Sequence, residues 1–187
     1  MPAITTNDLK TGITLELDNG LFQVLEFQHV KPGKGGAFVR TKLRNVRTGA
    51  VLERTFNAGV RVEQAIVERQ DMQLLYKDGD DYVFMNTSTY DQINIPKATL
   101  GDAADYLVES SVAQVASYQG QIIGVEVPAS VELTVTQTEP GVQGDRVSGA
   151  RKPATLETGK TVQVPLFVET GDRIRVDTRT GEYITRV

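Results

Sequence analysis

Three kinds of residue that often carry chemistry are scarce or missing in this sequence. It has no cysteine and no tryptophan, and His29 is its single histidine. The lack of cysteine excludes a disulfide framework, a thiolate metal site and a cysteine nucleophile. No Gly-x-Ser-x-Gly, His-Glu-x-x-His or acidic metal motif occurs. We therefore expect no enzyme, no metal, no cofactor and no chemical role for His29.

Long apolar runs are also missing. No stretch approaches the roughly 20 apolar residues that span a bilayer. The first residues, Met1 to Asp8, lack the charged and then apolar pattern of a secretion signal. These features predict a cytoplasmic protein that does not enter a membrane.

Charge is unevenly distributed along the chain. The net charge of −4 alone argues against nucleic-acid binding. Between Phe27 and Leu52, however, there is no aspartate or glutamate, and six basic residues occur there: Lys31, Lys34, Arg40, Lys42, Arg44 and Arg47. The acidic residues concentrate further on, at Asp71, Asp78, Asp80, Asp81, Asp91, Asp102, Asp105 and Glu109. This pattern predicts a basic end that can contact RNA and an acidic middle that avoids non-specific binding.

Short alternating segments between glycine-rich turns predict a mainly β chain of three small domains. Residues 1–64 resemble an SH3-like (KOW-like) barrel. We expect a hairpin turn at Asp18-Asn19-Gly20 and a long hairpin that carries the loop Lys31-Pro32-Gly33-Lys34-Gly35-Gly36 at its tip. The expected strands are Ile13–Leu17, Leu21–Phe27, Phe38–Leu43 and Val51–Phe56.

Residues 65–127 and 128–187 each resemble an OB-fold. In the central domain we expect hairpins around 77–81 and around Gln119-Gly120, and one helix that Asp102 caps and that includes Leu107 and Val108. In the C-terminal domain we expect a long polar loop from Glu139 to Lys152. The expected strands there are Val131–Thr136, Thr161–Val164, Leu166–Val168, Arg173–Val176 and Tyr183–Ile184.

The loop around Lys34 has two interpretations. Its glycines allow close approach to a surface, so the lysine could deliver an ammonium group to an anionic target. The other interpretation is an ordinary exposed hairpin tip whose lysines provide solubility, and composition alone favours it. It is no Walker A motif, because neither serine nor threonine follows Lys34.

The strand after this loop places Arg40, Lys42 and Arg44 on one face, because side chains alternate along a strand. Such a row suits phosphate contacts along a groove. A solvated outer face is the alternative, although ordinary surfaces mix both signs of charge and no acid is near in the sequence.

Two segments carry a resemblance to a known family. Residues 152–171, from Lys152-Pro153-Ala154-Thr155-Leu156 to Glu169-Thr170-Gly171, resemble the signature of bacterial translation elongation factor P. The tip from Lys31 to Phe38 and the ending from Val176 to Tyr183 are also similar to that family, and the likeness extends over the whole chain.

The resemblance implies an L-shaped, tRNA-like molecule, a monomer that binds the ribosome between the peptidyl-tRNA and exit sites. It implies stimulation of peptide-bond formation at consecutive prolines, with Lys34 at the CCA end of the peptidyl-tRNA. Lys34 would be open to extension by a lysine-modifying enzyme. The implied RNA contacts are Lys31, Arg40, Lys42, Arg44, the loop Gly144-Asp145-Arg146 toward the exit-site mRNA codon, Tyr183 and Arg186.

Three other functions are alternatives to this one. A divergent elongation-factor-P-like paralogue would favour a different tip residue, and Lys34 between glycines argues against it. A general RNA-binding protein with SH3-like and OB domains remains open. A small hydrolase would need a cluster of acids in a cleft, and the sequence offers no motif for one.

Overall fold

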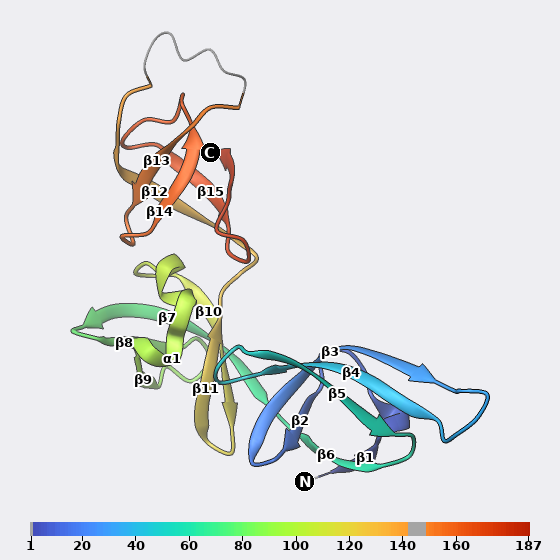
Figure 1. Ribbon diagram of the computed structural model, residues 1–187. Coiled ribbons are helices and arrows are strands. Elements are labelled where there is room, and N and C mark those ends of the chain that lie inside the picture. Colours follow the sequence, from blue (N-terminus) through green and yellow to red (C-terminus); the bar gives the residue numbers. More distant parts are fainter. Residues whose placement is uncertain (1, 142–148) are drawn as a thin grey trace. The chain divides into compact units, whose positions relative to one another are not determined.

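The computed structural model describes residues 2–141 and 149–187. The chain forms three sheets, in the orders β1-β6-β2-β3-β4-β5, β11-β10-β7-β8-β9 and β14-β13-β12-β15-β16 (Figure 1). Contacts divide it into two compact units, Met1–Arg69 with Ala116–Gly124, and Gln70–Val115 with Val125–Val187. The expected mainly β architecture is confirmed.

The N-terminal sheet has six strands. Its strands are β1 (Ala3–Thr5), β2 (Thr14–Leu17), β3 (Gly20–Val30), β4 (Phe38–Asn45), β5 (Val51–Asn57) and β6 (Arg61–Ala65), with a short 3-10 turn at Thr6–Asp8. The inward side chains alternate as expected, and Leu15, Val24, Val39 and Leu43 are fully buried. The sequence did not predict β1, which pairs with β6 at the edge of the sheet.

The turn between β2 and β3 differs in detail from the expectation. Asp18 and Asn19 adopt the positive φ values of 49° and 63°, and Gly20 already begins β3 opposite Leu17. Asp18 and Asn19 therefore form a two-residue hairpin turn, and its backbone twist matches that of the flanking strands. Asn and Asp tolerate that conformation better than other residues with a Cβ, so glycine is not required there.

The central sheet consists of β7 (Glu68–Asp78), β8 (Asp81–Asn86), β9 (Gln92–Pro96), β10 (Val112–Tyr118) and β11 (Gln121–Glu126). The two expected hairpins are confirmed. The expected helix is wrong: a one-turn helix α1 spans Lys97–Leu100, and a 3-10 helix spans Gly101–Tyr106. Gly101, with φ of 56°, ends the α-helix after one turn, so Asp102 caps no helix and Leu107 lies outside.

The tip of the β10–β11 hairpin packs in the N-terminal unit. Ala116 and Ile123 form a buried cluster with Leu21 and Ala65. The hydroxyl of Tyr118 donates to Glu16 Oε2 at 3.3 Å. Burial of the ring, helped by the charge of Glu16, raises the pKa of Tyr118. A hairpin from the middle of the sequence therefore completes the packing of the first unit.

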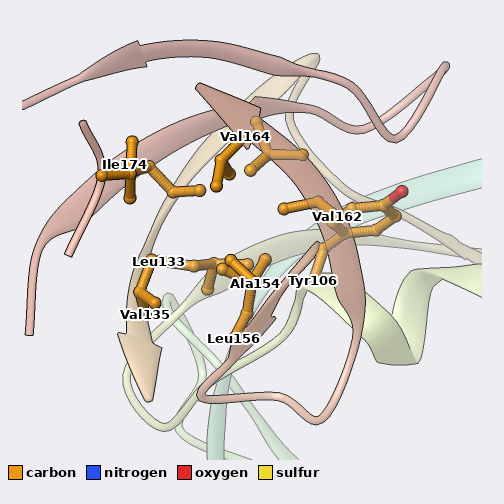
Figure 2. Close-up of a cluster of buried hydrophobic side chains, with 10 residues drawn as sticks. Tyr106, Leu133, Val135, Ala154, Leu156, Val162, Val164 and Ile174 are labelled. Atoms are coloured by element: carbon orange, nitrogen blue, oxygen red, sulfur yellow. The ribbon is translucent and has the colours of Figure 1, made fainter. Parts of the chain in front are cut away.

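The C-terminal sheet consists of β12 (Ser130–Thr138), β13 (Arg151–Leu156), β14 (Thr161–Pro165), β15 (Arg173–Asp177) and β16 (Tyr183–Arg186). Its strands enclose a core that Figure 2 shows, to which Tyr106 contributes from the segment before β10. Lys152 is buried on β13, and its Nζ donates to the backbone carbonyl of Glu139 just after β12.

Two expectations for this domain are wrong. Residues 166–168 form a turn rather than a strand, and Val168 N bonds to Pro165 O at 3.2 Å. The strand β13 was not predicted, because it contains Pro153. The structure accommodates Pro153 because the register with β12 ends at Ala154, so no ladder bond from residue 153 to that strand is missing.

Candidate RNA-contact site

The tip loop lies at the end of a long hairpin stem. Strands β3 and β4 pair from Phe22 opposite Asn45 to Val30 opposite Phe38, and they extend together into the loop (Figure 1). All residues from Lys31 to Gly36 are exposed. Lys34 makes no hydrogen bond or ion pair with any residue the structure describes. Its ammonium group is therefore free to meet an external partner.

The glycines of the loop provide freedom rather than packing. A Cβ added at Gly33, Gly35 or Gly36 would meet no atom within 4 Å. Gly35 has a φ of 103°, which residues with a side chain rarely adopt. The residues on both sides of Lys34 therefore have no side chain, and Gly35 lets the backbone adopt a conformation that a bulkier residue would disfavour.

The outer face of β4 carries the predicted basic row. Along β4, Val39, Thr41 and Leu43 are buried, so Arg40, Lys42 and Arg44 share the opposite face. Arg40 and Arg44 are exposed and make no ion pair with the described residues. Arg40 lies opposite Gln28 and Thr55, and Arg44 opposite Gln23 and Val51. These two cations are therefore available for phosphate oxygens.

Lys42 has different neighbours. Its Cα partners are Glu26 on β3 and Glu53 on β5. The expectation that no acid lies near the basic row is therefore wrong: these two glutamates stand just outside the acid-free window in the sequence, and the sheet brings them beside Lys42. Opposite charges on paired positions attract, so Lys42 presents less net positive charge than its neighbours do.

A groove of about 450 Å³ runs over this face, lined by Glu26, Phe27, Gln28, Arg40, Thr41, Lys42 and Glu53. Sequence reasoning missed both glutamates as part of it. The pairing of Lys42 with Glu53 could have been inferred from the sequence, because the two residues lie equally far along the chain from the turn at 45–50, which joins β4 to β5. His29 stacks edge-on against Phe27, with ring centroids 5.7 Å apart, which is a packing role.

The remaining predicted contacts lie in the C-terminal domain. Tyr183 is half-buried and packs against the core of that domain. The guanidinium of Arg186 lies 5.0 Å from the ring centroid of Phe167 and 3.6 Å from Asp172. Phe167 is 55% exposed, and it was not singled out from the sequence. Gly144, Asp145 and Arg146 lie outside the described residues.

The described parts of the chain offer neither a metal-binding cluster nor a membrane-spanning helix. Residues 2–141 and 149–187 contain no group of three or more His, Cys, Asp or Glu side chains that could hold a metal ion. Within the same residues, no helix has both the length and the apolar character needed to cross a membrane.

Family models match almost the whole chain. An elongation factor P KOW-like domain matches residues 5–62, an elongation factor P OB domain matches 67–125, and an elongation factor P C-terminal domain matches 131–186. These three matches follow the three sheets in order.

Curated relatives and solved structures agree with these matches. Elongation factor P of Acidothermus cellulolyticus is 62% identical over 182 residues, which is 97% of each chain. Elongation factor P of Frankia casuarinae is 60% identical, over 98% of each chain. The structure of eukaryotic translation initiation factor 5A from Methanococcus jannaschii covers 65% of this chain and 90% of its own, with a TM-score of 0.55 and 23% identity, and shares the fold. The chain therefore belongs to the elongation factor P family of translation factors.

Proposed function

We propose that this translation elongation factor binds the ribosome between the peptidyl-tRNA and exit sites and stimulates peptide-bond formation at consecutive prolines. The observation that carries the proposal is the free Lys34 at the end of the β3–β4 stem, flanked by glycines and exposed throughout. A protein that only needed a soluble hairpin tip would not require three glycines around one lysine.

The physical task is to position a poorly reacting substrate. Proline has a fixed φ and a rigid ring, so a peptidyl-prolyl-tRNA and a prolyl acceptor reach the reactive geometry rarely. A cation placed against the phosphates and ribose oxygens of the CCA end restricts the unproductive geometries. The rate rises because the reacting groups are oriented, with no covalent step on the protein. The factor is accordingly no enzyme in the ordinary sense.

Binding of tRNA then depends on the cations behind the tip. Lys31 at the loop and Arg40 and Arg44 on β4 supply charge that phosphate contacts can use. Lys42, between Glu26 and Glu53, contributes less of this field and can instead hold the two carboxylates in place. We assign the sequence-independent part of the affinity to Arg40 and Arg44.

The other contacts are distributed over the C-terminal domain. We infer that Arg186 and Tyr183 contact RNA and that the loop with Gly144, Asp145 and Arg146 contacts the exit-site mRNA codon. Arg186 is suited to this role because its guanidinium stacks on the exposed ring of Phe167, which leaves a flat surface for a base.

Lys34 is also the expected site of any modification. An enzyme that extends the lysine needs an accessible ammonium group and a narrow backbone around it, and the tip offers both. An extension would lengthen the reach of the cation without changing the fold that carries it. The intact mass of the protein from its native host would reveal such a group.

The central test replaces Lys34 by alanine. We expect Lys34→Ala to abolish rescue of a reporter with three consecutive prolines in a reconstituted translation system. The thermal unfolding of the variant should match that of the wild type, because Lys34 is exposed and makes no hydrogen bond or ion pair with the described residues.

Lys10→Ala is the matched control, since Lys10 is an exposed lysine of the same domain away from the tip loop. It should rescue normally. Normal synthesis of the reporter with Lys34→Ala would refute the role of the tip, even if ribosome binding persisted.

A further inference from the structure

A tyrosine from the central domain lies inside the core of the C-terminal domain. Tyr106 is the last residue of the 3-10 helix that precedes β10, and it is only 5% exposed. The other members of its buried cluster all come from β12 to β15 and from the turn that holds Val168. Figure 2 shows Tyr106 in this core beside Val162. Tyr106 therefore fills space in a domain to which its own sheet does not belong.

Two turns of the C-terminal domain lie against the ring. In the turn between β13 and β14, Lys160 Nζ is 5.4 Å from the centroid of the Tyr106 ring, within the range of a cation–π contact. In the turn between β15 and β16, a Cβ added at Gly181 would lie 3.3 Å from the Tyr106 hydroxyl oxygen. Gly181 also has a φ of 77°. Glycine at this position therefore suits both the backbone conformation and the small space beside Tyr106.

The residue before Tyr106 makes polar contacts with the β13–β14 turn. Thr158 Oγ1 donates to the backbone carbonyl of Asp105 at 2.6 Å. Asp105 Oδ2 lies 3.8 Å from Lys160 Nζ. Lys160 therefore faces the carboxylate of Asp105 and the ring of Tyr106 at the same time. This ion pair is partly exposed and adds little stability by itself, but it fixes the direction in which the segment enters the C-terminal domain.

These contacts supplement a single short connection between the two domains. The chain passes from β11 to β12 through residues 127–129. Val108, Val127 and Val131 pack against the same C-terminal core as Tyr106. Domains joined by one connection move relative to each other unless a large apolar interface holds them. Apart from the tip of the β10–β11 hairpin, the central and C-terminal domains form one compact unit, as such an interface requires.

We propose that Tyr106 is a positioning residue, which fixes the C-terminal domain to the central domain and so presents Arg186 and Tyr183 to RNA in a constant place. The inference rests on the proposed binding to the ribosome. A fixed joint makes that binding stronger, because less conformational freedom is lost when two distant contacts form at once. Tyr106 acts through the domain that it holds and needs no contact with RNA.

The first test measures the joint itself. The chain has no cysteine, so spin labels attached at Ser88→Cys and Gln163→Cys report the distance between the two domains. Ser88 lies between β8 and β9, Gln163 lies on β14, and both are exposed. We expect one narrow distance distribution in the otherwise unsubstituted chain, and a distribution broader by roughly twofold or more with Tyr106→Ala. Tyr106→Phe keeps the ring, and its distribution should stay narrow.

Two further variants separate the joint from a general loss of stability. Val164 is fully buried in the same core, so Val164→Ala and Tyr106→Ala should both lower the Tm, but only Tyr106→Ala should broaden the distribution. Lys160→Glu leaves the core intact and places a second negative charge beside Asp105 and the ring, so it should also broaden the distribution. If Tyr106→Ala does not fold, Lys160→Glu decides the test.

Three outcomes of the distance measurement would overturn the inference. One is a broad distribution in the chain that carries only the labels. Another is a narrow distribution in Lys160→Glu, with Tyr106→Ala either narrow or unfolded. The third is a distribution that Val164→Ala broadens as much as Tyr106→Ala does.

The second test asks whether the joint matters for binding. Tyr106→Ala should lower the affinity for purified ribosomes by roughly tenfold, because two contacts joined by a flexible connection bind less tightly than two that are held in place. Tyr106→Phe and Val164→Ala should bind as the unsubstituted chain does. Equal affinity of Tyr106→Ala and Val164→Ala would overturn the positioning role.

Failure of the proposed function would look different. If the unsubstituted chain did not bind ribosomes at all, the proposed function would be refuted and the positioning role with it. If the unsubstituted chain bound ribosomes and rescued the proline reporter, and Tyr106→Ala did both equally well, only the positioning role would be refuted.

Discussion

The N-terminal and central domains are of similar size and both mainly β, yet they carry opposite charge. The N-terminal domain exposes Arg40 and Arg44 without partners among the described residues, on the outer face of one strand. The central domain exposes acids instead, two of them, Asp78 and Asp80, at the β7–β8 turn, with the half-buried Asp81 beside them. The net charge of −4 is a sum over the whole chain, so it reveals neither the basic N-terminal domain nor the acidic central domain. Local charge, and not the total, indicates which partner each domain can take.

The C-terminal domain provides a third case, in which charges are paired. Arg173 Nε and Arg175 Nη2 lie 3.2 and 2.9 Å from the carboxylate oxygens of Glu132. Arg179 pairs with Asp177, and Arg186 with Asp172. Arg40 and Arg44 of the N-terminal domain therefore have more positive charge to offer a phosphate than these paired arginines, because a paired cation has already lost part of its attraction for phosphate.

Removal of the unpaired Arg40 and Arg44 is expected to change ribosome binding more than any other substitution that tests this difference in charge. The double variant Arg40→Ala, Arg44→Ala should bind the ribosome more weakly. Each phosphate contact releases counterions on binding, so fewer counterions are released when these contacts are lost. The slope of log affinity against log salt concentration should fall by about two units, one for each contact. Binding measured over a salt series tests this.

The matched control lies in the acidic domain. Lys97 is exposed there, and Lys97→Ala should leave the slope unchanged. An equal loss of slope in both variants would mean that the basic face has no special part in binding.

A smaller effect is expected at Lys42. Because Glu26 and Glu53 flank it across the sheet, Lys42→Ala should change the salt slope by less than one unit. Converting both glutamates to glutamine should remove the negative charge that screens Lys42. In that background, Lys42→Ala should lower the salt slope as much as Arg40→Ala does alone. If Lys42→Ala matches Arg40→Ala in the wild-type background, the glutamates do not screen it.

The smallest effect concerns acid stability of the paired domain. Hydrogen bonds from Arg175 and then Arg173 hold the pKa of Glu132 below its ordinary value. A lowered folded pKa means that the stabilisation is present above the unfolded pKa and is lost as pH falls through the folded pKa. Glu132→Gln should therefore lose slightly less Tm than the wild type between neutral pH and about pH 3.

Thermal unfolding at a series of pH values measures this difference. Glu157→Gln gives a reference for removing a carboxylate elsewhere in the same domain, in the turn between β13 and β14. A wild-type Tm that falls no more steeply with acid than that of Glu132→Gln would show that the two arginines contribute nothing through this carboxylate.

Much of the fold was accessible from residue patterns. Alternation of apolar residues predicted most strands, because a strand with one buried face must alternate. Glycine, asparagine and aspartate marked the hairpin turns, since few other residues tolerate positive φ. Local rules disfavour two of the segments that escaped prediction: β13 contains Pro153, and the one-turn helix at Lys97–Leu100 is too short for a helical period.

The exposed tip of Lys34 and the acid-free window were likewise predictable from local composition, because neither depends on a distant part of the chain. Contacts between segments far apart in the sequence were not. Folding placed Glu26 and Glu53 beside Lys42 and packed the β10–β11 tip onto Leu21. Register and packing decide such neighbours, and these are properties of the whole folded unit rather than of any one segment.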